Sequence, residues 1–166
     1  QSPNIAFEVW QEDAHVSVEI DNCYFDNLLS FVGKTWATRP YNGTKRIFVH
    51  DNVFDILGPR ANGYGYGIEC NIGDIEIYRN WFNGGANGVV NWHEPTRYIS
   101  IHHNTFYGIV HYYPTAAITF NRYDTANGGG MLDCLIQNNT HHMNNTGTST
   151  FNLQQHQLHF LQINRA

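Results

Sequence analysis

The residues that could do chemistry recur at fixed places in an eight-residue pattern. The pattern reads apolar, any, apolar, any, any, Asn, any, aromatic; clear copies begin at residues 18, 47, 75 and 99, and a weaker copy begins at residue 134. Three positions of these copies carry carboxylates, imidazoles, a phenol and a guanidinium. They are the second position, with Glu19, Phe48, Glu76, Ser100 and Leu135; the fourth, with Asp21, His50, Tyr78, His102 and Gln137; and the fifth, with Asn22, Asp51, Arg79, His103 and Asn138.

These side chains have the chemistry that a sugar-binding groove needs. Aromatic faces stack on the C–H surfaces of sugars, while Asp, Asn and His side chains bond to hydroxyl groups. For cleavage by β-elimination, Arg79 would neutralise a uronate carboxylate. The proton would be removed by His50, Tyr78 or His102. The acidic balance of the chain opposes a polyanionic substrate unless a bound cation intervenes.

Hydrolysis of a glycosidic bond would instead need two carboxylates about 5 to 9 Å apart. The groups that could supply them are Glu19, Asp21 and Asp51, or Glu69 and Glu94. On the structural alternative, the same face is a polar, solvated sheet surface. Asp51 and Arg79 would then form an ordinary exposed ion pair that contributes little.

A second candidate site is the segment at residues 91–97. An aromatic ring, an imidazole, a carboxylate and a guanidinium are crowded there into one turn, at Trp92, His93, Glu94 and Arg97. Arg122 lies in the corresponding loop of the next repeat and could share a cleft with them. The structural alternative is a corner held by local ion pairs.

Two sets of residues follow from these patterns. The predicted catalytic residues are His50, Asp51, Tyr78, Arg79, His102, His93 and Glu94. The predicted substrate-binding residues are Asp21, Glu76, His103, Trp92, Arg97 and Arg122.

Short strands must position these residues. Apolar first and third positions, rich in Val and Ile, alternate with outward residues at the period of a β-strand. The positions equivalent to Asn are 23, 52, 80, 104 and 139, so the repeats are 29, 28, 24 and 35 residues apart, which is typical of a β-solenoid. A second strand in each repeat is predicted at residues 7–10, 67–70, 88–92 and 116–120.

The Asn position and the aromatic position of the repeated pattern predict two internal columns. Asn at the bend tolerates left-handed backbone angles, and stacked Asn amides can hydrogen-bond from one coil to the next. The aromatic position predicts a stack of Phe25, Phe54, Phe82 and Phe106 inside the coils, continued by His141.

Length and charge limit the classes of function. The 166 residues suffice for one domain, residues 1–166, with about five to six coils. Neither end has an obvious polar cap, so we expect a fragment of a longer solenoid or ends covered by other chains. A net charge of −5 argues against a nucleic-acid partner, and the absence of a long apolar run argues against a membrane span. The sequence leaves the oligomeric state open.

The repeated I-x-I-x-x-N-x-F pattern resembles the right-handed parallel β-helix of the pectate-lyase-like superfamily over essentially the whole chain. The resemblance implies an all-β, single-stranded right-handed parallel β-helix. It also implies a secreted protein that binds a polysaccharide or glycan and cleaves it as a lyase or glycoside hydrolase. A noncatalytic carbohydrate-binding, adhesive or structural solenoid is the alternative.

No cofactor is predicted. Adjacent residues on a strand face opposite ways, so the pairs His102–His103 and His141–His142 are poor chelators and no metal site is assigned. In the fold that the resemblance implies, Ca²⁺ held by outward Asp and Asn residues is the more plausible ion.

Overall fold

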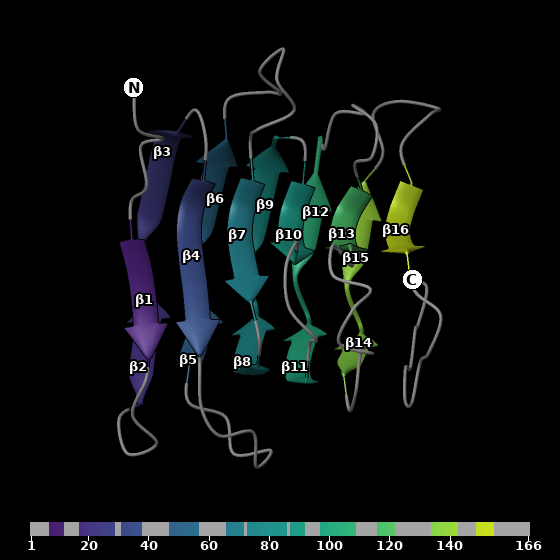
Figure 1. Ribbon diagram of the computed structural model, residues 1–166. Helices are drawn as coiled ribbons and strands as arrows, with labels where there is room; N and C mark the ends of the chain where they lie inside the picture. The colour runs from purple at the N-terminus through teal and green to yellow at the C-terminus, as the bar shows by residue number, and fades with distance from the viewer. Residues whose placement is uncertain are drawn as a thin grey trace.

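The structure of the protein, a computed structural model, consists of parallel β-strands arranged in three sheets (Figure 1). It describes residues 7–11, 17–28, 31–37, 47–56, 66–71, 73–85, 87–91, 97–108, 116–121, 134–142 and 149–154. Every regular element in these ranges is a β-strand. None of the described residues belongs to a helix long and apolar enough to cross a membrane.

Three sheets form because each coil contributes one strand to each of them. Sheet A consists of β1 (Phe7–Gln11), β4 (Phe31–Ala37), β7 (Tyr66–Asn71), β10 (Asn87–Asn91), β13 (Ala116–Asn121) and β16 (Ser149–Gln154). Sheet B consists of β2 (Val18–Asp21), β5 (Ile47–His50), β8 (Gly73–Tyr78), β11 (Arg97–His102) and β14 (Leu135–Gln137). Sheet C consists of β3 (Tyr24–Leu28), β6 (Val53–Ile56), β9 (Trp81–Gly84), β12 (Thr105–Tyr107) and β15 (Thr140–His142).

Each strand pairs in parallel with its equivalent in the next coil. The pairing confirms the predicted all-β chain with stacked parallel strands, an arrangement consistent with a β-solenoid. The second strand predicted for each coil is confirmed, as β1, β7, β10 and β13 of sheet A, but the pattern did not predict a third strand. A third strand follows the Asn position, because the residues after it resume an extended backbone that pairs as sheet C.

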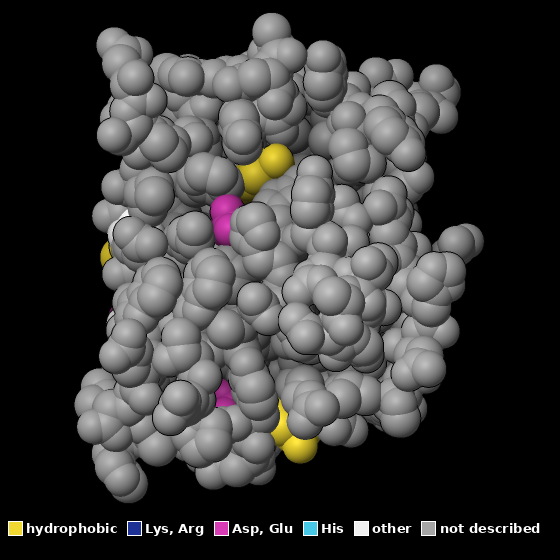
Figure 2. Space-filling view, viewed as in Figure 1, with side chains coloured by type: hydrophobic (Ala, Val, Ile, Leu, Met, Phe, Trp, Pro, Cys, Tyr) yellow, Lys and Arg dark blue, Asp and Glu magenta, His cyan; other side chains and the backbone are white. Residues whose placement is uncertain are grey.

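The apolar positions of the pattern lie in a core to which all three sheets contribute. Figure 1 shows sheet A in front of the strands of the other two sheets. In Figure 2, which has the same view, small areas of acidic and hydrophobic side chains appear among the described residues. The first and third pattern positions of the middle coils are fully buried, as their alternation predicts. They are Ile47, Ile75 and Ile99, and Val49, Ile77 and Ile101.

A column of phenylalanine rings runs through the core as predicted. Phe54 and Phe82 stack with ring centroids 4.7 Å apart, and Phe82 and Phe106 with centroids 4.9 Å apart. Phe25 extends the column, 5.0 Å from Phe54. His141 pairs in register with Phe106, so it occupies the next place. These offset stacks combine burial of a large apolar area with favourable ring contacts.

Two glycines of sheet A allow the backbone to approach these rings. A Cβ atom on Gly88 would lie 2.3 Å from the Phe106 ring, and one on Gly67 would lie 2.6 Å from the Phe82 ring. Either methyl group would displace a buried aromatic ring of the stacked phenylalanine column. Glycine is therefore required at both places by close approach.

The Asn positions form the predicted ladder beside this core. The Asn80 side-chain oxygen accepts bonds from the Asn52 backbone N–H at 3.1 Å and from the Asn52 side chain at 3.0 Å. Asn104 accepts the same pair of bonds from Asn80, and Asn139 accepts the pair from Asn104. Each of these amides also donates to a carbonyl of the preceding coil, as Asn80 does to Val49 at 2.8 Å.

The predicted place of the left-handed backbone was wrong by one residue. Positive φ angles of 51° to 55° occur at the fifth pattern position, at Asn22, Asp51, Arg79, His103 and Asn138. The chain turns at this residue, so the following Asn can direct its side chain inward and reach the next coil. Five outward-facing residues therefore adopt the left-handed backbone conformation, which among non-glycine residues Asn, Asp and His tolerate best.

Replacement of Asn80 by Ala should destabilise the protein strongly. Asn80 is 2% exposed, and its loss would leave the buried amides of Asn52 and the carbonyl of Val49 without this partner. Each buried polar group left unsatisfied costs about 1–3 kcal/mol. Chemical denaturation should show a loss of at least about 2 kcal/mol. The control, Asn83→Ala in β9 of the same coil, should lose much less; equal losses would contradict a special role of the ladder.

Candidate functional site

The predicted strip of outward residues is assembled by strand register. Asp21, His50, Tyr78, His102 and Gln137 face one another across neighbouring strands of sheet B. The fifth-position residues follow them at the turn into sheet C. The described members of both predicted sets therefore lie on one continuous surface that crosses five coils.

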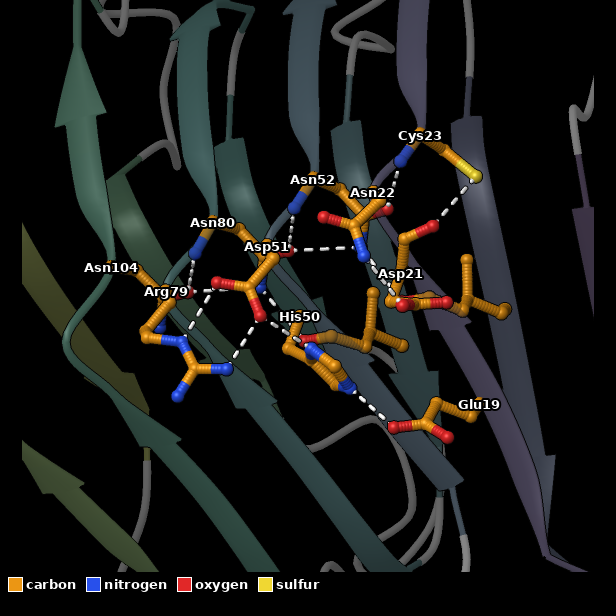
Figure 3. A network of polar contacts seen from close by, with 12 residues as sticks. Glu19, Asp21, Asn22, Cys23, His50, Asp51, Asn52, Arg79, Asn80 and Asn104 are labelled. Atoms are coloured by element: carbon orange, nitrogen blue, oxygen red, sulfur yellow. Dashed lines mark hydrogen bonds and ion pairs between the residues drawn. The ribbon is translucent and has the colours of Figure 1, made fainter.

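His50 lies between two carboxylates on this surface. Its Nε2 is 2.6 Å from Glu19 Oε1, and its Nδ1 is 2.7 Å from Asp51 Oδ2 (Figure 3). Burial of the ring, which is 7% exposed, would lower the pKa of His50, but the hydrogen bonds to Glu19 and Asp51 outweigh burial and raise it. With both ring nitrogens already engaged by carboxylates, His50 has no free nitrogen to remove a proton from a substrate.

Arg79 forms a bidentate pair with the Asp51 carboxylate and shares the Oδ2 atom with His50. Its Nε donates to Oδ1 at 2.7 Å and its Nη2 donates to Oδ2 at 2.5 Å (Figure 3). These bonds, with the bond from His50, hold the pKa of Asp51 well below its usual range. The Arg79 guanidinium is thus already neutralised, which weakens its predicted role as partner of a uronate carboxylate.

Three rings stack along the fourth-position column. Tyr78 lies between His50, at a centroid distance of 4.6 Å, and His102, at 5.2 Å. The Arg79 guanidinium carbon also lies 4.7 Å from the Tyr78 ring centroid. Burial raises the pKa of the Tyr78 phenol, which opposes its use as a base near neutral pH.

A directed chain of hydrogen bonds continues along the strip. Asn138 Nδ2 is 3.4 Å from His103 Nε2, His103 Nδ1 is 2.8 Å from His102 Nδ1, and His102 Nε2 is 2.8 Å from Glu76 Oε1. Because an amide nitrogen only donates, neutral rings carry their protons on His103 Nδ1 and His102 Nε2. The left-handed turn at His103 brings the two rings together, although adjacent residues on a regular strand would face apart.

The strip therefore satisfies most of its own polar groups. The His50 ring stands between Glu19 and Asp51, so these two carboxylates cannot flank a sugar bond as hydrolysis requires. The contacts favour the structural alternative for this part of the surface. They bind one coil to the next through side chains.

The second candidate site lies largely outside the described residues. The described residues do not include Trp92, His93, Glu94 and Arg122. The predicted role of Glu94 as one of two carboxylates for hydrolysis therefore stays a prediction. Arg97 is the first residue of β11, and its side chain is also outside what is described. In the part of the chain that the structure describes, no three His, Cys, Asp or Glu side chains are grouped so that they could hold a metal ion.

Sequence reasoning missed a second surface, on the outward face of sheet C. Trp81 and Tyr107 are 43% and 40% exposed, on neighbouring strands, and their rings stack with centroids 6.1 Å apart. His142, on the next strand, follows with its ring 5.8 Å from Tyr107. We call Trp81, Tyr107 and His142 the aromatic row.

The sequence contains the residues of this row, but they lie at the end of the eight-residue pattern or just beyond it. Trp81 occupies the seventh position, which points away from the buried Phe82, and Tyr107 and His142 lie one residue beyond the eighth. An outward face for sheet C could be inferred only once the residues after Asn were recognised as a strand.

Polar groups flank the aromatic row on the same sheet. Asp55 accepts a bond from the Asn83 amide at 2.8 Å and one from the exposed Tyr24 hydroxyl at 3.1 Å. Asp26 pairs in register with Asp55 and is exposed. The face thus combines exposed rings with fixed hydrogen-bonding groups.

Comparison with known proteins adds no family to this description, since no protein-family model, curated protein or solved structure matches the chain.

The charge of His50 should make stability depend on pH. The pKa of His50 in the folded protein lies above its ordinary value of 6.5, so its contribution is complete below about pH 6.5 and is lost as pH rises through the folded pKa. The pKa of Asp51 is lowered from 3.8, so its contribution is present above that pH and is lost as pH falls toward the folded pKa. Stability from this pair should be greatest between these limits.

Glu19→Gln should bring the pKa of His50 down, because it removes one carboxylate and leaves the desolvation. NMR titration of the His50 ring would measure the shift directly. Asp21→Asn is the matched control, since Asp21 is the next outward carboxylate of β2 and accepts a bond from Asn22. A His50 pKa at or below 6.5 in the unmodified protein, or an equal effect of both substitutions, would contradict this account of the network.

Proposed function

We propose that this chain is a secreted right-handed parallel β-helix of the pectate-lyase-like kind that binds polysaccharide on its outward surface. The single observation that carries the proposal is the aromatic row, where the exposed rings of Trp81 and Tyr107 stack across neighbouring coils. Rings held on a sheet keep their exposed parts in a fixed place, and exposed aromatic surface can pack against the C–H faces of sugar rings.

The rigidity of sheet C supports a role in recognition. Trp81 and Tyr107 belong to strands whose inward residues, Phe82 and Phe106, are locked in the buried phenylalanine column. Their backbone is therefore fixed before a ligand arrives, and little ordering cost remains to be met on binding. Single exposed aromatics are ordinary on protein surfaces, but a stacked pair continued by His142 forms a contiguous patch.

Polar groups beside the row support a glycan in preference to an apolar partner. The Asn83 amide, the Asp55 carboxylate and the Tyr24 hydroxyl lie in one hydrogen-bonded set on the same face. Sugar rings present apolar faces and hydroxyl edges together, so a ligand of this class would use both kinds of group.

Binding without cleavage is the form of this function that the geometry favours. The predicted catalytic groups His50, Asp51 and Arg79 are engaged with one another, and the Tyr78 ring is covered by two imidazoles. Catalysis needs groups that are free to change protonation or partner beside the reacting bond. The proposal therefore assigns the strip to stability and the aromatic row to recognition.

The aromatic row should be necessary for polysaccharide binding. The unmodified chain would be tested on a panel of soluble neutral and acidic polysaccharides by affinity electrophoresis, and the polymer that retards it most would be chosen. Trp81→Ala combined with Tyr107→Ala should weaken that binding at least about tenfold, because the exposed aromatic surface of both rings is lost. Release of reducing ends and the ultraviolet absorbance of an unsaturated product would be followed in parallel.

Phe48→Ala is the matched control, because Phe48 is an aromatic on the outward side of sheet B, in register with Glu19 and Glu76, and lies outside the row and its polar groups. It should keep most of the binding, and both variants should melt near the unmodified protein. Retention by no polysaccharide would overturn the proposed function. Turnover with undiminished activity in the double variant would show that cleavage occurs at another place.

A further inference from the structure

We infer that the aromatic row accepts uncharged polysaccharide chains and discriminates against chains of uronate or sulfated sugars. This inference rests on the proposed function and names the ligand class of the same site. It is carried by the distribution of charge around the stacked rings.

Carboxylates are the only formally charged side chains on the described strands of sheet C. Asp26 and Asp55 are partners in register on β3 and β6, in the column that continues through Asn83 to Tyr107 and His142. Neighbouring strands are about 4.8 Å apart, so the two carboxylates lie well within a Debye length of each other at physiological salt. Neither Lys nor Arg occurs in the described residues of β3, β6, β9, β12 and β15.

Arg79, the cation at the turn before β9, offers little compensation. Arg79 directly precedes Asn80 and Trp81 in the chain, but its guanidinium makes two bonds to Asp51. His50 donates to the same carboxylate and to Glu19. Arg79 and His50 are thus already paired, and a polyanion would have to compete with Asp51 for them.

The hydrogen bonds on the face also favour a neutral ligand. Asp55 is fixed by Tyr24 and Asn83, so its carboxylate cannot turn away from an approaching anion without breaking two bonds. A hydroxyl group can donate to a carboxylate, whereas a second carboxylate cannot. The chain's net charge of −5 adds a longer-range repulsion of the same sign.

The arrangement of the rings gives a direction to the bound chain. Trp81, Tyr107 and His142 occupy three successive strands, β9, β12 and β15, so the row runs across the strands and along the stack of coils. A polysaccharide that follows the row would cross successive coils in the same way. Its charged substituents, if it had any, would then pass beside the column that contains Asp55.

Pairs of polymers with the same backbone and different charge would test this inference. The pairs are hydroxyethylcellulose with carboxymethylcellulose, methyl-esterified polygalacturonate with polygalacturonate, and dextran with dextran sulfate. On the backbone that the unmodified chain binds, the uncharged form should bind at least about tenfold more tightly at low salt. A chelator would be present, so that a divalent cation cannot bridge two anions.

Asp26→Lys supplies the matched variant, because Asp26 is exposed and its replacement leaves the core untouched. This substitution should strengthen binding of the anionic polymer and so reduce the difference in affinity between the uncharged and anionic forms. Added salt should abolish this increase in affinity for the anionic polymer. Asp21→Lys, an equal charge change on the outward face of sheet B, should have a smaller effect.

The outcomes separate the two claims. Equal or tighter binding of the anionic form by the unmodified chain would overturn the inference and leave polysaccharide binding intact. Loss of binding in the Trp81 and Tyr107 variant, together with a preference for the uncharged form, supports both. Retention of neither form of any pair, nor of any other polysaccharide in the panel, would overturn the proposed function itself.

Discussion

The hydrogen-bonded ladder of Asn52, Asn80, Asn104 and Asn139 is the constraint on which the rest of the structure depends. A parallel strand pair can slip in register, and a slip of one residue would move every inward side chain to the surface. The ladder opposes such a slip, because each amide must meet one particular amide and one particular carbonyl of its neighbours. It therefore fixes the phenylalanine column on one side of the turn and the outward columns on the other.

The cost of the ladder is a left-handed residue before every ladder position. Asp51, Arg79 and His103 adopt this backbone region, although none of them is a glycine. Their side chains then leave the turn side by side along the stack, where charges and imidazoles of successive coils meet. The Asp51 contacts to His50 and Arg79 are a consequence of this geometry. A cluster that has the composition of a catalytic site thus has a structural cause.

The sequence was sufficient to predict the features that repeat. The ladder and the stack of Phe54, Phe82 and Phe106 could be predicted because each depends on one residue type at one place in every coil. The strand of sheet C was missed because the pattern ended at the aromatic position, only two residues after Asn. The left-handed residue was misplaced because Asn is common at both places, and only the direction of the ladder side chain distinguishes them.

The site was harder to predict because composition does not reveal which polar groups are already paired. His50, Tyr78 and Arg79 were correctly placed in adjacent columns, yet spacing alone could not show that both His50 nitrogens would face carboxylates. Conversely, Trp81 and Tyr107 do not repeat from coil to coil, so a search for regularity passes over them.

The difference between residues that repeat in every coil and residues that do not has a physical basis, and this basis bears on function. In a stacked fold, repeated residues are used to hold successive coils together, since each must satisfy the copy above and the copy below. A ligand, by contrast, binds to groups that their neighbours leave exposed. Trp81 and Tyr107 stack with each other, yet each ring keeps a large exposed surface that no neighbouring coil covers. Departures from the repeat are therefore where recognition is to be sought in this chain.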